Sequence, residues 1–187
     1  MYGYDEWLEF QRMAGDEFAR RLRRVTDWAA PTPDAEWDVR ALVAHVTEEQ
    51  QWVSPLLDGR SLAQARLLVE PLGDDLVAEW DRHHQLASRA WRSHDERQHV
   101  QLSHDTVTAL QYLTEQVSDV VIHTWDLARA IGDDERLQDD LVEAVWTVFA
   151  PQRETLWASG LYAAPLAVSD DAPLQYRLLA LTGRDPG

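Results

Sequence analysis

The sequence contains no cysteine, no lysine and no asparagine, and its 17 basic residues are all arginine. Without cysteine there is no disulfide framework, no thiolate-ligated zinc and no cysteine nucleophile. Without lysine the chain can form no Schiff base and has no phosphate-loop lysine, which excludes pyridoxal enzymes and P-loop NTPases. A Gly-x-Ser-x-Gly motif is also absent, so the sequence does not favour a serine hydrolase.

Acidic side chains dominate the surface charge, because 33 acidic residues against 17 basic ones give a formal net charge of −16. Such a charge opposes non-specific binding to nucleic acid and to anionic membranes. The sequence has no run of 18 apolar residues and no basic segment followed by an apolar one. We therefore expect a cytoplasmic protein that binds neither nucleic acid nor a membrane.

The chain has 187 residues, of which 45% are hydrophobic, so it is long enough to bury a core of its own. Apolar residues recur three or four positions apart over long segments, which is the spacing of one helical face. We find no convincing strand pairing, although residues 94–105 have room for a few extended residues. Helices are predicted at 5–28, 39–57, 75–93, 106–131 and 140–159, with a break or kink at Pro151, and in a short segment between Pro173 and Gly183.

These elements predict an all-α helical bundle. We expect a single domain over residues 1–187, with the core bundle at about 5–159 and a C-terminal extension at about 160–187. Asp38 is a plausible N-cap of the second helix, and Gly132 is a good residue to end the fourth.

Seven histidines are present, and without cysteine any transition-metal site must use imidazole nitrogen and carboxylate oxygen. His45 and Glu49 lie one helical turn apart on the face of the second helix that otherwise looks buried. A buried glutamate is costly unless it is paired or bound to something. The alternative is a core histidine whose hydrogen bond is supplied by Glu49.

The fourth helix carries a carboxylate and an imidazole at the same spacing, in Asp119 and His123. A pair four residues apart projects two ligand atoms in one direction, which suits a divalent metal held between bundle helices. The alternative is an ordinary contact within one helix, and such pairs are common by chance.

The other histidines give weaker indications. His83 and His84 are adjacent on the third helix, so we expect only one to face inward. It is a fourth ligand, a base at the site or a polar residue at its rim, and we favour the rim. His94, His99 and His104 lie in the connector and are expected to be solvated.

Three segments carry a family resemblance. Residues 37–46 read W-D-V-R-A-L-V-A-H-V, residues 119–126 read D-V-V-I-H-T-W-D, and residues 178–186 read L-L-A-L-T-G-R-D-P. The first two segments resemble the metal-binding domain of mycothiol-dependent maleylpyruvate isomerases. The tail resembles short stand-alone members of the same DinB-like superfamily, so the match covers nearly the whole chain. The resemblance implies a DinB-like four-helix bundle, with additional C-terminal helices and one divalent metal at one end.

Carried over by position, the resemblance implies His45, Asp119 and His123 as the metal ligands, with water or substrate completing the shell. Glu49 and Asp126 would orient the ligand imidazoles by hydrogen bonds. One departure is that the isomerases have a glutamate where this chain has Asp119, so the metal would lie nearer the helix or bind less tightly. They also have a separate C-terminal domain that 187 residues cannot accommodate, so isomerase activity itself is not transferred.

The leading hypothesis is a divalent-metal-binding DinB-like protein that catalyses a metal-dependent transfer or isomerisation with a low-molecular-weight thiol such as mycothiol. Zinc is the expected metal, with nickel or another divalent ion left open. Because the chain has no cysteine, any sulfur nucleophile must arrive with a cosubstrate. Arg40 or Arg129 could pair with a substrate carboxylate. A homodimer is left open.

Two other hypotheses remain at this point. One is a non-catalytic metal-binding protein that acts in stress response or ligand binding. The other is a plain helical domain whose histidines are ordinary core or surface residues.

Overall fold

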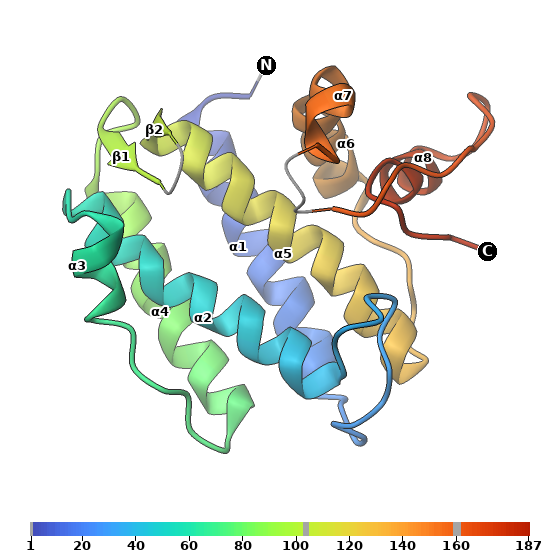
Figure 1. The fold of residues 1–187 in the computed structure, drawn as a ribbon, viewed down its shortest axis with the longest axis horizontal. Coiled ribbons are helices and arrows are strands. Elements are labelled where there is room, and N and C mark those ends of the chain that lie inside the picture. The colour runs from blue at the N-terminus through green and yellow to red at the C-terminus, as the bar shows by residue number, and fades with distance from the viewer. Residues whose placement is uncertain (1, 103–104, 159–161) are drawn as a thin grey trace. The chain divides into compact units, whose positions relative to one another are not determined.

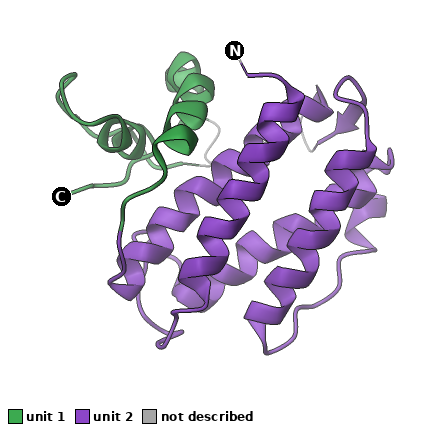
Figure 2. Ribbon diagram, turned by 180° about the vertical axis from the view of Figure 1, so that it is seen from behind, with its two compact units in different colours: residues 1, 135–187 green, residues 2–134 purple. Residues whose placement is uncertain are grey.

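The computed structural model describes residues 2–102, 105–158 and 162–187. The chain divides into two compact units, residues 2–134 and residues 135–187 (Figure 2). This division describes contacts and does not test whether the two units fold together. The single domain expected from the sequence therefore stays a prediction. No helix formed by the described residues is long and apolar enough to cross a lipid bilayer.

Four long helices build the larger unit, which confirms the predicted all-α bundle (Figure 1). Helix α1 packs most extensively against α5, and α2 packs most extensively against α4, while further contacts between α1 and α4 and between α2 and α5 complete the bundle. The bounds of these helices are Tyr4–Leu22 for α1, Val39–Leu57 for α2, Leu76–Ser93 for α4 and Ala109–Ile131 for α5.

Polar contacts at the helix ends show in which direction each helix runs. Arg24 Nη1 donates a hydrogen bond to Asp133 Oδ1 at 2.7 Å, just beyond the C-terminal ends of α1 and α5, so these two helices run parallel. The Tyr4 hydroxyl donates to the carbonyl of Trp91 at 2.7 Å, which joins the start of α1 to the end of α4. Helices α1 and α4 therefore run in opposite directions.

The connection between α2 and α4 returns the chain along the bundle and contains one short helix, α3 (Leu62–Arg66). At the far ends of α2 and α4, His94 Nε2 lies 3.4 Å from Asp58 Oδ1. Helices α2 and α4 are therefore parallel, and α2 is antiparallel to α5. This topology places the first half of α2 beside the second half of α5 (Figure 1).

Large apolar side chains from all four helices fill the interior of the bundle. Each predicted apolar stripe faces inward, and burial of these side chains is the main favourable term in folding. The largest fully buried apolar side chains of this unit are Phe18, Leu22, Leu42, Leu56, Leu57, Trp80, Trp91, Leu113, Ile122, Trp125 and Leu127.

The predicted end of the first helix is wrong, because α1 stops at Leu22 and not at residue 28. Val25 and Thr26 are β-branched and lower the helix propensity at this point. Asp27 Oδ1 accepts a hydrogen bond from the backbone N–H of Ala29 at 3.0 Å. This turn offers the backbone an alternative to the helix, so a loop begins well before the prolines.

The expectation that no strands pair is also wrong. Strand β1 (His99–Gln101) pairs antiparallel with β2 (Thr106–Thr108), and Val100 faces Val107. The predicted start of the fourth helix at residue 106 therefore moves to Ala109. Thr108 caps α5 through a reciprocal pair of hydrogen bonds with residue 111, which ends the strand and starts the helix at one residue.

In the unit of residues 135–187, α6 packs against α8. The helix predicted over 140–159 is broken at Pro151, as expected: α6 ends at Phe149, Pro151 lies in a 3₁₀ turn, and a further short helix follows at Arg153–Leu156. The predicted end at residue 159 lies outside the described residues. Proline has no backbone N–H and its ring clashes with the preceding turn, which favours the end of the α-helix at this point. The helices of this unit are α6 (Asp139–Phe149), η1 (Ala150–Gln152), α7 (Arg153–Leu156) and α8 (Leu174–Leu181).

Candidate metal centre

The candidate site lies where the first half of α2 faces the second half of α5. Helix α2 starts at a defined residue, because Asp38 Oδ1 accepts a hydrogen bond from the Ala41 N–H at 2.8 Å. His45 lies two turns later on α2. Asp119 and His123 lie one turn apart on α5, so the two helices bring together donors that are far apart in the sequence.

The three predicted ligands converge. One ligand atom from each of His45, Asp119 and His123 lies within 4.8 Å of the other two, and this is the one group of three or more potential ligands among the described residues. His45 Nε2 is 3.8 Å from Asp119 Oδ2, and His123 Nε2 is 3.4 Å from Asp119 Oδ1. The Asp119 carboxylate thus faces both imidazoles, each with a different oxygen.

Of these separations, the 3.4 Å between His123 and Asp119 matches the spacing of two donors on one zinc ion, and the 3.8 Å between His45 and Asp119 is slightly longer. Zinc bonds to nitrogen or oxygen of about 2.0 to 2.2 Å place two donors of a tetrahedral shell about 3.3 to 3.6 Å apart. The observed 3.8 Å between His45 and Asp119 is too long for a hydrogen bond. Two nitrogens and one oxygen are also the donor set that zinc and similar divalent ions accept.

His123 is held from its other side by a buried carboxylate. Its Nδ1 lies 3.0 Å from Asp126 Oδ2, so the predicted hydrogen bond is present, with the carboxylate as acceptor. Burial opposes the charged imidazolium, but the charge of Asp119 and the hydrogen bonds to Asp119 and Asp126 outweigh it and raise the pKa of His123 to about 9. Without a metal, His123 is therefore a cation between two carboxylates.

His45 differs electrostatically from His123. Burial lowers the pKa of His45, and the charge of Asp119 opposes this shift only in part. His45 is therefore neutral at pH 7, which is the form that binds a metal. Among the described residues, none forms a hydrogen bond to its Nδ1.

Glu49 lies next to the triad but does not contact a ligand imidazole through a hydrogen bond of its own. It accepts a hydrogen bond from Gln116 Nε2 at 3.3 Å. Burial and the charge of Asp119 raise the pKa of Glu49 to about 7. Gln116 was not predicted, although it lies three residues before Asp119 on the same inward face of α5.

Trp37 is a site residue that the helical periodicity could not identify, because it lies in the loop before α2. Its ring centroid is 4.6 Å from that of His45 and 5.5 Å from that of His123. The two imidazole rings are 5.4 Å apart and nearly perpendicular. One indole therefore touches both candidate nitrogen ligands.

The other described histidines lie away from the triad. Of the adjacent pair expected to have one inward-facing member, His83 is buried and His84 is half-buried, and neither belongs to the triad. His83 Nε2 lies 3.1 Å from Glu79 Oε2, and His84 stacks on Trp80 at 4.8 Å. The expectation that His94 is solvated is wrong, because its side chain is only 18% exposed and its Nδ1 lies 2.7 Å from the Ala90 carbonyl oxygen.

His99 is exposed at the start of β1, as expected for a connector residue. His104 lies outside the described residues. The two arginines considered for a substrate carboxylate each lie over an indole: Arg40 over Trp28 at 5.2 Å and Arg129 over Trp125 at 4.5 Å.

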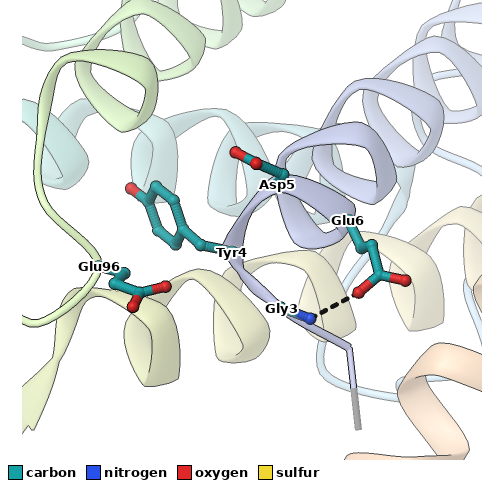
Figure 3. A pocket seen from close by; sticks show the side chains of 5 residues that line it. All are labelled: Gly3, Tyr4, Asp5, Glu6 and Glu96. Carbon is teal, nitrogen blue, oxygen red and sulfur yellow. Dashed lines mark hydrogen bonds between the residues drawn. The ribbon is translucent and has the colours of Figure 1, made fainter.

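A hollow at the start of α1 has a volume of about 530 Å³ and is lined by Gly3, Tyr4, Asp5, Glu6 and Glu96 (Figure 3). Glu6 accepts a hydrogen bond from the Gly3 N–H at 2.7 Å and so caps the helix. The carboxylates of this hollow do not belong to a converging group of three potential ligands within the described residues. Acidic residues at a helix N-terminus are explained by the helix dipole.

Residues 11–128, more than half of the chain, match the family of the mycothiol maleylpyruvate isomerase N-terminal domain. Among solved structures, the chain is similar to a mycothiol-dependent maleylpyruvate isomerase crystallised as a histidine-to-alanine mutant. The TM-score is 0.69, the sequence identity is 18%, and the match covers 85% of this chain and 72% of that one. At this identity the likeness shows a shared fold. No curated protein matches the chain.

Proposed function

Because the chain belongs to the family of the mycothiol maleylpyruvate isomerase N-terminal domain, we propose that it binds one divalent metal, zinc first, through His45, Asp119 and His123. With this metal it would catalyse a transfer or isomerisation that uses a low-molecular-weight thiol such as mycothiol. The observation that carries the proposal is the convergence of two imidazoles and one carboxylate, from two helices, within 4.8 Å.

The metal, when bound, would supply the charge that stabilises a thiol as its thiolate. The chain itself has no cysteine, so the sulfur must belong to the cosubstrate. Asp126 holds the Nδ1 side of His123 and directs the Nε2 side toward the centre. Asp119 supplies the negative charge that both imidazoles face.

Glu49 contributes to the site through the hydrogen bond that it accepts from Gln116. The hydrogen bond between them joins α2 to α5 one turn away from the ligands, and so resists a change in the spacing of the two helices. We propose that this spacing, rather than a direct hydrogen bond to an imidazole, is what Glu49 contributes.

The proposal extends to a small-molecule thiol as partner but not to maleylpyruvate as substrate. The sequence identity to the similar isomerase is 18%, which supports a shared fold and no particular reaction. The expectations of a cytoplasmic location, of nickel or another ion in place of zinc, and of a homodimer stay predictions.

Metal analysis of the purified protein tests the site. We expect one equivalent of zinc or a similar divalent ion in the wild type and loss of it in His45→Ala and in His123→Ala. His99→Ala is the matched control, because His99 is exposed and lies away from the triad. Full metal content in both ligand variants would show that the triad is not the site.

A second experiment separates an enzyme from a binding protein. The zinc-loaded chain is incubated with mycothiol and a set of electrophiles, and consumption of the thiol is followed over time. We expect consumption that His123→Ala abolishes. Zinc binding without thiol consumption, and without any effect of mycothiol on the melting temperature, would favour the non-catalytic alternative.

A further inference from the structure

The indole of Trp37 lies against both proposed nitrogen ligands, which come from different helices. Its ring centroid is 4.6 Å from His45, with 38° between the planes, and 5.5 Å from His123, with 42° between the planes. Tilted aromatic contacts at these distances are favourable and depend on ring orientation. A single ring thus restricts the rotation of two imidazoles.

The two imidazoles differ in what else holds them. His123 has Asp126 on its Nδ1 at 3.0 Å. Within the described residues, His45 has no hydrogen bond to Nδ1, and the contacts of its ring are with Trp37, His123 and, at 3.8 Å, Asp119. Metal-ligating histidines ordinarily have a second partner that fixes the ring. For His45 the nearest ring among the described residues is the indole, at 4.6 Å between centroids, against 5.4 Å for the imidazole of His123.

Backbone hydrogen bonds hold Trp37 in its place in the loop. Its carbonyl accepts hydrogen bonds from the Thr32 hydroxyl at 2.9 Å and from the Thr32 N–H at 3.3 Å. Its own N–H donates to the Asp34 carbonyl at 3.0 Å. The next residue, Asp38, caps α2. The indole is therefore attached to a closed turn that ends in the helix carrying His45.

We propose that Trp37 is a positioning residue that fixes the imidazole rings of His45 and His123 in the orientation that a divalent metal requires. The inference rests on the proposed metal site and adds a residue that neither ligates the metal nor donates a hydrogen bond to a ligand. The flat ring carries the effect, so a non-aromatic side chain of similar bulk cannot replace it. The effect is larger at His45, which has no carboxylate on its Nδ1.

Zinc affinity of Trp37 variants, measured by competition with a chelator, tests the proposal. We expect Trp37→Leu to raise the zinc dissociation constant by about 10- to 100-fold, the range seen when partners of metal ligands are removed. Trp37→Phe keeps a ring and should stay within about threefold of the wild type. The absorption spectrum of the cobalt-loaded protein should change in Trp37→Leu and not in Trp37→Phe, because it reports ligand geometry.

Trp28→Leu is the matched control, since Trp28 lies in the same loop but stacks on Arg40 and not on an imidazole. We expect it to bind zinc like the wild type. Circular dichroism of the metal-free variants checks that each folds, and Trp37→Met replaces Trp37→Leu if the latter unfolds.

Three results would overturn the proposal. Zinc affinity and a cobalt spectrum in Trp37→Leu that equal those of the wild type would show that the indole only packs the loop. An equal loss of affinity in Trp28→Leu would assign the effect to loop closure. A wild-type chain that binds no zinc or cobalt would remove the metal site of the proposed function, and the positioning role with it.

Discussion

His123 lies between Asp119 and Asp126, and this arrangement makes proton and metal compete for one ring. The two carboxylates overcome the cost of burial and raise the pKa of His123 to about 9 in the metal-free chain. A raised histidine pKa stabilises the fold fully below the unfolded pKa of about 6.5, and this contribution disappears as the pH rises through about 9. A metal, in contrast, requires the deprotonated ring.

We therefore predict that zinc affinity rises by up to about tenfold per pH unit between pH 7 and pH 9, because binding must displace the His123 proton. Chelator-buffered titrations at three pH values measure this slope. Asp126→Asn removes one of the two carboxylates, which lowers the pKa of His123 in this variant. The rise of its zinc affinity with pH should therefore be shallower than in the wild type. A zinc affinity in the wild type that does not change from pH 7 to pH 9 would contradict the prediction.

The site residues differ in how far the sequence reveals them. Asp119 and His123 are four residues apart on one helix, and this spacing, with the family resemblance, identifies the pair and its partner His45. Trp37 begins the segment 37–46 that carries the resemblance, but no helical spacing relates it to the ligands, and Gln116 is in none of the three segments. Trp37 lies in a loop whose course depends on backbone hydrogen bonds, and Gln116 acquires its role only when α2 brings Glu49 to it.

At the level of elements, α1 and α4 approach closely at Gly15. A Cβ added at this glycine would lie 2.1 Å from His84 Nε2. The ring of His84 cannot move away freely, because it stacks on Trp80 with only 15° between the planes and lies 3.4 Å from Gln11. The absence of a Cβ at Gly15 therefore leaves the space that the imidazole of His84 occupies.

We predict that Gly15→Ala destabilises the bundle by about 1 to 3 kcal/mol, as overpacked cores do. In an unhindered helix the same change would stabilise by about 0.5 to 1 kcal/mol, so the sign of the effect decides the matter. Urea denaturation measures the free energy of unfolding. In the background of His84→Ala the clash is gone, and Gly15→Ala should become neutral or stabilising. A stabilising effect in the wild-type background would show that His84 does not need a glycine at position 15.

The elements follow the sequence where the signal is long. Helices α2 and α4 match the predicted segments almost residue for residue, since nearly twenty residues of periodicity and an aspartate cap specify each. The hairpin of β1 and β2 was missed because three residues are too few to show an alternating pattern. Its pairing comes from tertiary contacts, with Val100 fully buried.

At the scale of the whole molecule, the site and its supports belong to one unit. The three proposed ligands, Asp126, Glu49 and the loop with Trp37 all lie within residues 2–134, and the family match at 11–128 lies there too. The helix-end contacts that show the bundle topology, such as Arg24 with Asp133, also lie within this unit.

A chain of residues 1–134 should therefore fold on its own and bind zinc with the affinity of the full chain. Circular dichroism with thermal unfolding tests folding, and the chelator competition used above tests the site. Residues 1–159 are the comparison, since the sequence predicts the end of the core there. Cooperative unfolding and zinc binding in the longer fragment alone would show that the bundle depends on α6, and that the core expected from the sequence at about 5–159 is the folding unit.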